Sequence, residues 1–335
     1  SFDRASYPGA LALYAIVVFH CFHKRCLLIR YSSRFFPQKI IGTADSNHDR
    51  SPENKTNFKD KLSAMKTIII PTDFSAIATN AMHYGIDMAK ATNASILLLH
   101  VYQVPVSFTD TPIVLVSVEE LRKGAEEQIM RLKEEVEHMT SGSLKVYTET
   151  RLGNVADELE NLCNKINPFA VVMGTKGASG VERILFGSNT LTAIRHLTWP
   201  VICVPPGKTY GNGIKKIGFA CDFKDVVKTT PTHFIIDFVK EFHAELDVLN
   251  VDYHNRHFKP ETPEQSILLH TMLEEANPSY HFIEHADIED GINEFAEKNN
   301  LDLIITIPKK HRLLDSVFKT SSTKQLVYQS HVPVM

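Results

Sequence analysis

Glycines, hydroxyls and one amide gather in the stretch MGTKGASGVERILFGSNT, residues 173–190. Glycine lets backbone approach a ligand closely and allows positive φ. The stretch ends at the expected start of a helix, where free N–H groups and the dipole favour an anion. This combination suits phosphate groups, although glycines alone are as typical of an ordinary turn with a serine N-cap. The glycines are Gly174, Gly177, Gly180 and Gly187, and the polar residues that follow are Ser188, Asn189 and Thr190.

Other motifs for chemistry fail on spacing. The tripeptide GKT at 207–209 resembles a P-loop, but Ile202 stands where that loop needs a glycine. The stretch DYHNRH at 252–257 contains metal-ligand residue types, yet histidines in an exposed loop are ordinary and no partner cluster follows. No serine–histidine–acid set is visible. We therefore predict no catalytic residues and no metal site.

Composition limits the class of protein. The chain has 335 residues, 43% hydrophobic and 22% charged, which favours two globular domains. A net charge of -3 gives no indication of a nucleic-acid or membrane partner. The five cysteines have neither metal-ligand nor redox spacing, so we expect a reducing, cytoplasmic setting.

Residues 1–64 differ from the rest of the chain. The apolar run 9–19 is short for a membrane span, and its basic residues follow it, unlike those of a signal peptide. The polar remainder has no period, which indicates disorder. We expect 1–64 to be poorly ordered or to lie upstream of the true start. The alternative is a membrane-associated anchor.

From Met65 the hydrophobic pattern alternates between two periods. Short apolar runs predict buried strands, and steps of three or four residues predict helices with one buried face. Ser75 is the expected N-cap of the first helix. Alternating strands and helices imply a parallel sheet covered on both sides. The expected strands begin at 66 and cover 94–102, 144–152, 168–174 and 199–206; the expected helices cover 76–92, 118–139, 154–167 and 188–197.

The same order of elements then repeats. Residues 215–224 match 66–75 at an offset of 149, and residues 155–201 match the C-terminal part of the chain at a single offset of 133. Apolar positions stay in register across helix, strand and helix, so the chain holds two copies of one α/β unit. The fifth strand of the second copy is cut short at Met335, and we expect the chain to be a fragment at both ends. The predicted organisation is 1–64, a first domain at 65–206, a linker at 207–213 and a C-terminally truncated second domain at 214–335.

Three motifs in this order resemble the universal stress protein family. They are PTDFS at 71–75, LLHV at 98–101 and the spacing Gly174-x2-Gly177-x9-Gly187-Ser188. The resemblance covers 65–335. It implies an α/β fold of two tandem, open, five-stranded parallel sheets of Rossmann-like type, with strand order 3-2-1-4-5 and flanking helices. Family members with this loop bind ATP.

The resemblance also implies roles for particular residues. The phosphates are expected to be held by the helix start, with magnesium. Asn189 departs from the family pattern, in which an apolar residue is common, but its amide could serve the loop. The adenine end is assigned to Pro71, Thr72, Asp73 and Val101, the ribose and phosphates to Met173, Gly174 and Gly177, and the phosphates to Gly187, Ser188, Asn189 and Thr190.

The second repeat lacks the glycine loop. At the offset of 133, Ile307 faces Gly174, and Thr320 faces Gly187. Side chains then occupy space that backbone–phosphate contacts would need. We predict one ATP per chain, bound within 71–190, with the second repeat as a pairing or regulatory half.

Three functions remain open. The first is an ATP-binding stress-response protein that signals through a change of shape or partner. The second is a slow ATPase or phosphotransferase, for which Asp73 and Lys176 are the nearby candidates. The third is a dimerisation scaffold that needs no nucleotide. The resemblance implies pairing of the two domains within the chain, through their fifth strands, or a homodimer.

Overall fold

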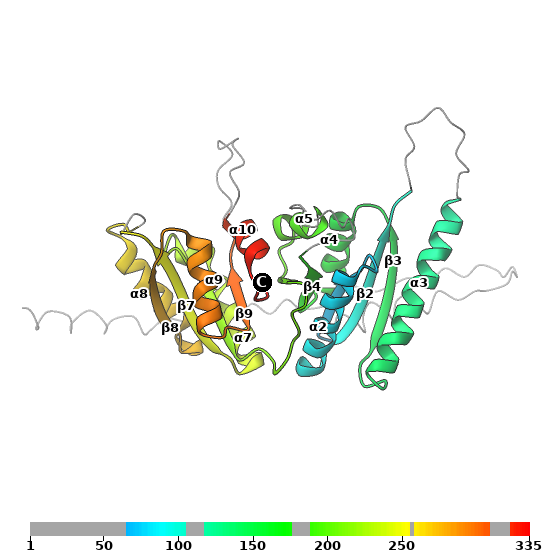
Figure 1. Cartoon of the computed structure of the whole chain (residues 1–335), viewed down its shortest axis with the longest axis horizontal. Helices are drawn as coiled ribbons and strands as arrows, with labels where there is room; N and C mark the ends of the chain where they lie inside the picture. The colour runs from blue at the N-terminus through cyan, green and yellow to red at the C-terminus, as the bar shows by residue number, and fades with distance from the viewer. Residues whose placement is uncertain (1–64, 105–116, 176–187, 255–257, 309–321) are drawn as a thin grey trace, which may run out of the picture. The chain divides into compact units, whose positions relative to one another are not determined.

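The computed structural model describes residues 65–104, 117–175, 188–254, 258–308 and 322–335. The predicted extension 1–64 lies outside these ranges. Both repeats lie in one compact unit of the chain. Each repeat forms a parallel sheet with helices on its two faces (Figure 1).

The first sheet has five strands in the order β3-β2-β1-β4-β5, as predicted. Its central strand is an apolar run whose first four residues are buried, as expected of a strand covered on both faces. Strand β1 pairs with β2 from Thr67 opposite Ser95 to Pro71 opposite Leu99. The strands are β1 (Thr67–Pro71), β2 (Ser95–Tyr102), β3 (Val146–Leu152), β4 (Ala170–Gly174) and β5 (Val201–Val204).

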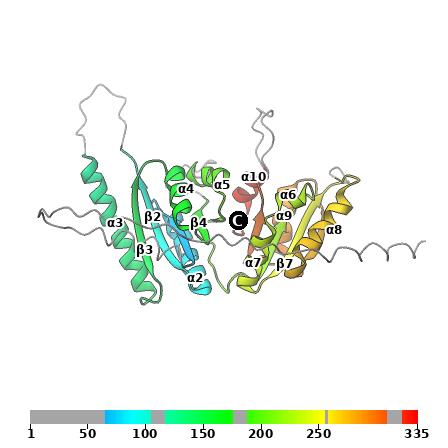
Figure 2. The same cartoon turned by 180° about the vertical axis from the view of Figure 1, so that it is seen from behind.

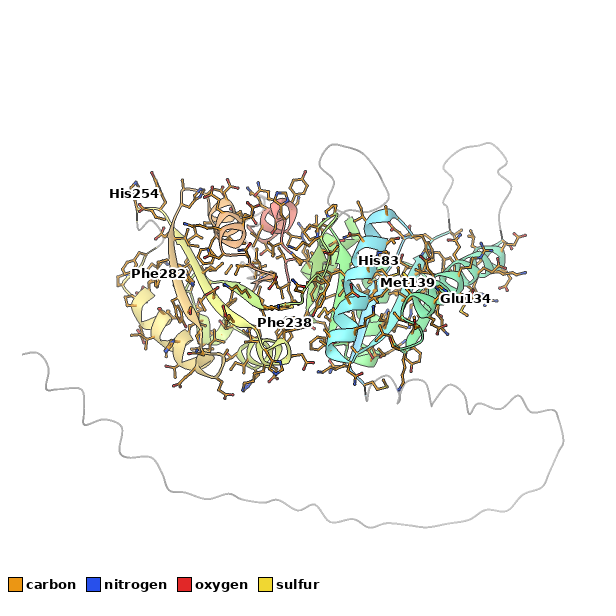
Figure 3. The ribbon with its side chains drawn as sticks, turned by 60° about the horizontal axis from the view of Figure 1, so that its bottom comes forward. His83, Glu134, Met139, Phe238, His254 and Phe282 are labelled. Carbon is orange, nitrogen blue, oxygen red and sulfur yellow. The ribbon has the colours of Figure 1, made fainter. Side chains whose placement is uncertain are left out.

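Alternate residues of the strands supply two apolar layers. Ile68 belongs to one hydrophobic cluster and its neighbour Ile69 to the other, because side chains alternate across a strand. The N-cap predicted at Ser75 is confirmed, since its hydroxyl accepts from the N–H of Ala78 at 3.2 Å. Figure 3 labels His83 on the first of the helices and Met139 at the end of the second. The helices are α2 (Ala76–Thr92), α3 (Val118–Met139), α4 (Val155–Ile166) and α5 (Ser188–His196).

The second sheet has the strand order β8-β7-β6-β9, so the α/β fold is confirmed in both repeats. In the described residues this sheet has four strands and not the five expected, because the chain forms only an isolated bridge at Val334 where the fifth strand would lie. Its first helix is interrupted at Thr230 and Pro231, because proline lacks an N–H and its ring blocks the preceding turn. The short piece α6 is labelled in Figure 2. The strands are β6 (Lys216–Ala220), β7 (Glu245–Asp252), β8 (Ser279–Glu284) and β9 (Leu303–Thr306); the helices are α6 (Val226–Thr229), α7 (Thr232–Phe242), α8 (Thr262–Leu273), the 3₁₀ helix η1 (Glu274–Ala276), α9 (Ile288–Lys298) and α10 (Ser322–Gln329).

Val334 stands where a fifth strand of the second sheet is expected. It forms a parallel bridge with Ile304 of β9 and an antiparallel bridge with Cys203 of β5. The N–H of Cys203 donates to the carbonyl of Val334 at 2.8 Å, and the N–H of Val334 donates back at 3.1 Å. The segment at 333–335 therefore hydrogen-bonds to the edge strands of both sheets, because Pro333 and Met335 on either side of Val334 bond to the backbone of Ile304 in β9.

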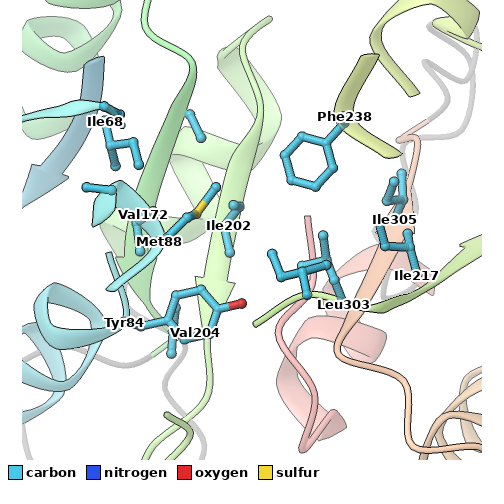
Figure 4. Close-up of a cluster of buried hydrophobic side chains, with 14 of the residues drawn as sticks. Ile68, Tyr84, Met88, Val172, Ile202, Val204, Ile217, Phe238, Leu303 and Ile305 are labelled. Carbon is cyan, nitrogen blue, oxygen red and sulfur yellow. The ribbon is translucent and has the colours of Figure 1, made fainter. Parts of the chain in front are cut away.

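The buried side chains of the two repeats form a common cluster. Ile202 and Val204 of β5 belong to it together with Phe238 of α7 and Ile305 of β9 (Figure 4). Phe238 also stacks on Phe169, with ring centroids 5.7 Å apart and planes 9° apart. Pairing of the repeats is thus built from apolar burial as well as from the backbone bonds at Val334.

Candidate nucleotide site

The turn after β1 is held by side chain to backbone hydrogen bonds. The hydroxyl of Thr72 accepts from the N–H of Phe74 at 3.0 Å, and a carboxylate oxygen of Asp73 accepts from the N–H of Ser75 at 3.1 Å. Phe74 has φ of 62°, which reverses the chain sharply. Thr72 is buried whereas Asp73 is exposed. The turn therefore presents the Asp73 carboxylate at the carboxyl edge of the sheet, next to Pro71 at the end of β1.

His100, which sequence reasoning did not select, fixes this turn from the neighbouring strand. Its Nδ1 lies 2.8 Å from the carbonyl oxygen of Thr72, and its ring contacts Phe74 with centroids 4.6 Å apart. The following residue, Val101, is half-buried and packs against the cluster that contains Met173. Val101 thus lies on the face of the sheet opposite His100, since successive residues of a strand alternate.

Gly174 is the last residue of β4, and packing against α2 explains why this residue is a glycine. A Cβ at this position would lie 2.6 Å from Cγ2 of Ile77 and 3.0 Å from the carbonyl oxygen of Ile77. The first turn of α2 therefore approaches the end of β4 so closely that only glycine fits. Met173, just before it, is buried within the sheet.

Helix α5 begins beside the end of β4. The hydroxyl of Thr190 donates to the carbonyl oxygen of Gly174 at 2.9 Å, and both groups are buried. Asn189 is exposed at the helix start, and Ser188 is the first helical residue. The structure thus brings together the ends of β1 and β4 and the start of α5. Gly177, Gly187 and Lys176 lie outside the described residues.

The second repeat retains the same turn, with Asp222 and Phe223 at the positions of Asp73 and Phe74. A carboxylate oxygen of Asp222 accepts from the N–H of Lys224 at 3.1 Å, and Phe223 has φ of 50°. The side chain of Asn250 donates to the carbonyl oxygen of Cys221 at 2.9 Å, as His100 contacts Thr72. The two residues differ in type, so the sequence carries no common motif for this bond. His100 and Asn250 occupy equivalent positions of β2 and β7.

The two buried thiols of the described part, Cys163 and Cys203, are unsuited to redox or metal chemistry. Burial raises the pKa of the Cys203 thiol to about 12, and burial is also the main cause that raises that of Cys163 to about 12. Both remain protonated at neutral pH, whereas the thiolate is the reactive form. Within the described ranges, no group of three or more His, Cys, Asp or Glu side chains could hold a metal ion. In the same ranges, no helix is long and apolar enough to cross a membrane.

Comparison with known proteins agrees with the two-repeat architecture. A universal stress protein of Methanocaldococcus jannaschii is 32% identical over 147 residues, which are 43% of this chain and 84% of the relative. Universal stress protein G of Escherichia coli O157:H7 is 31% identical over 144 residues, or 42% of this chain and 98% of the relative.

A solved universal stress protein from Archaeoglobus fulgidus has the same fold along both repeats. It superposes with a TM-score of 0.61 at 20% identity, over 80% of this chain and 96% of that one. The model of the universal stress protein family matches residues 65–205 and again 213–335. The chain therefore belongs to the universal stress protein family and carries two family domains in tandem.

Proposed function

We propose that the chain binds one ATP in its first repeat and acts in the cytoplasmic stress response through a nucleotide-dependent change of conformation or partner. One observation carries this proposal. The Asp73 turn and the Gly174–Thr190 contact lie at the ends of β1 and β4. The strand order reverses between these strands, and open parallel sheets bind their ligands at that crevice.

The residues present fit a nucleotide. The start of α5 offers backbone N–H groups and a positive dipole end to the phosphates. We expect the phosphates to bind as their magnesium complex. The exposed Asp73 carboxylate offers acceptors to ribose or base N–H and O–H groups. Bound ATP would add negative charge at this site, and the conformation or the partner of the chain would depend on whether ATP is bound.

The second repeat is expected to leave ATP unbound. Ile307 replaces Gly174 at the strand end, and Lys224 forms an ion pair with Asp222 at 3.8 Å. The side chain of Ile307 would occupy space that a phosphate needs beside the backbone. The carboxylate of Asp222 is less available to a ligand because it is paired with Lys224.

Calorimetric titration of nucleotide-free protein with ATP and magnesium tests the proposal. We expect a stoichiometry near one. Gly187→Glu should weaken ATP binding by about tenfold or more, because a carboxylate then occupies the phosphate position. Thr320→Glu, at the matching position of the second repeat, should leave the affinity unchanged. A stoichiometry near two, or unaltered binding by a folded Gly187→Glu protein, would refute the placement.

A further inference from the structure

Phe74 has a backbone conformation that its surroundings must stabilise. Its φ of 62° lies in the left-handed region, which a bulky side chain rarely adopts. It lies between Asp73 and Ser75, which are joined by a side chain to backbone hydrogen bond. Conformations of this kind persist only where neighbouring groups offset their cost. The position of the Asp73 carboxylate therefore depends on what contacts Phe74 and the residues before it.

His100 of β2 supplies two such contacts from one side chain. The carbonyl oxygen of Thr72 can only accept, so Nδ1 of His100 donates the 2.8 Å hydrogen bond between them. The ring of His100 also packs on the ring of Phe74, with centroids 4.6 Å apart and planes at 46°. His100 thus contacts both the backbone at the start of the turn and the strained residue itself.

The second repeat holds the equivalent turn with several side chains instead of one. The side chain of Asn250 donates to the carbonyl oxygen of Cys221 at 2.9 Å, but an amide has no ring to pack on Phe223. The ring contacts come instead from Tyr280 and Phe282 of β8, with centroids 6.4 Å and 5.9 Å from that of Phe223. A hydrogen bond to the carbonyl and a ring on the strained phenylalanine are therefore present in both repeats.

The strand register shows that the ring has changed strands between the repeats. Asn250 lies opposite Phe282 in the pairing of β7 with β8, and His100 lies opposite Thr150 in the pairing of β2 with β3. The pair is histidine with threonine in the first repeat and asparagine with phenylalanine in the second. Each pair supplies one donor and one ring. Two different pairs that meet the same requirement indicate that the turn needs both contacts.

We propose that His100 is a positioning residue of the nucleotide site, which holds the Asp73 turn ready for the nucleoside part of ATP. This inference rests on the proposed binding of ATP in the first repeat. A turn that already has its bound conformation costs less to order when the ligand arrives. Loss of the histidine should therefore weaken ATP binding through the turn, without any contact between His100 and the nucleotide.

Calorimetric titration of variants with ATP and magnesium tests this role. His100→Leu removes both contacts, and we expect the affinity for ATP to fall about tenfold. His100→Asn keeps the donor, as in the second repeat, and should lose less. Adding Thr150→Phe to His100→Asn copies the pair of the second repeat and should recover most of the affinity. Asn250→Leu is the matched control, because it removes the equivalent bond of the second repeat and should leave the affinity unchanged.

Hydrogen exchange without nucleotide separates this inference from the proposed function. The N–H groups of Phe74 and Ser75 bond to the side chains of Thr72 and Asp73, so they report directly on the turn. We expect both to exchange about tenfold faster in His100→Leu and near the natural rate in the double variant. If the natural chain binds no ATP, the proposed function fails, and these exchange rates still decide whether His100 holds the turn.

Unchanged ATP affinity in a folded His100→Leu protein would overturn the inference, as would unchanged exchange at Phe74 and Ser75. Equal losses of affinity for His100→Leu and His100→Asn would show that the hydrogen bond to Thr72 contributes nothing, and would also overturn it. A fall in affinity for Asn250→Leu as large as that for His100→Leu would assign the effect to a general loss of stability, against a positioning role.

Discussion

The hydroxyl of Thr190 donates a hydrogen bond to the carbonyl oxygen of Gly174 at 2.9 Å. These residues are separated by sixteen positions, and the intervening loop carries the glycines. The bond fixes the start of α5 against the end of β4, so the two ends of the loop are held at a defined separation.

Thr190→Val should destabilise the chain, because it removes this buried hydrogen bond while keeping the shape of the side chain. We expect a loss of about 1–2 kcal/mol in the free energy of unfolding. Thr190→Ser keeps the hydroxyl and should lose less. Urea unfolding compares the three proteins. A loss for Thr190→Ser that exceeds the loss for Thr190→Val would mean that the methyl group matters more than the hydrogen bond.

Two glycines should respond in opposite directions to alanine. Gly174→Ala places a Cβ 3.0 Å from the carbonyl oxygen of Ile77, so we expect a loss of about 1–3 kcal/mol. Gly124 lies within helix α3 with no atom within 4 Å of its added Cβ. Gly124→Ala should therefore stabilise by about 0.5–1 kcal/mol. Chemical denaturation of both variants gives the comparison, and a tolerated Gly174→Ala would contradict the close approach of α2.

Contacts between the repeats should depend on apolar burial more than on charge. Phe238 is 1% exposed, so Phe238→Ala should cost about 3–5 kcal/mol. Lys66 and Glu241 form an ion pair at 2.5 Å, but their side chains are 41% and 25% exposed. Glu241→Gln should cost about 1 kcal/mol or less. Thermal unfolding compares the stabilities of the two variants. A larger loss of stability for Glu241→Gln than for Phe238→Ala would show that charge contributes more than apolar burial.

The buried thiols predict a loss of stability in alkali. The pKa of Cys203 is raised from 9.0 to about 12 by burial, so the unfolded chain releases this proton first. The free energy of unfolding should be unaffected by this group below pH 9 and should fall between pH 9 and about 12. The slope is about 1.4 kcal/mol per pH unit for one thiol. Cys203→Ala should show a shallower decline in urea titrations; the same slope as the natural chain would exclude this cause.

Much of the fold was predictable because its signals are local and occur twice. The apolar run of β1, the N-cap Ser75 and the offset of 133 are visible in the sequence, and they predicted the elements and the two repeats. The strand order that the structure shows was implied by the family resemblance, which rests on short local motifs. The contact of His100 with Thr72 was not predictable. The second repeat makes the equivalent bond with Asn250, a different residue type, so no common motif marks it.

Other features of the site depend on packing across the fold. Sequence reasoning assigned Gly174 to a ligand contact, whereas the structure also requires it for the approach of Ile77. It assigned Thr190 to phosphate, and the structure gives that hydroxyl a partner in the protein. Close approaches of this kind join elements far apart in sequence, so they cannot be predicted from residue types alone. The predictions for Gly177 and Gly187 stay predictions, because both lie outside the described residues.

The double bridge at Val334 has a consequence for how the chain folds during synthesis. Strand β5 is complete at Val204, but its hydrogen-bonding partner lies about 130 residues later. Until those residues have left the ribosome, the first domain carries an open sheet edge, which is a template for pairing with other chains. Nascent chains should therefore be most prone to aggregation after the first domain has folded, and chaperones that cover strand edges should act in that interval.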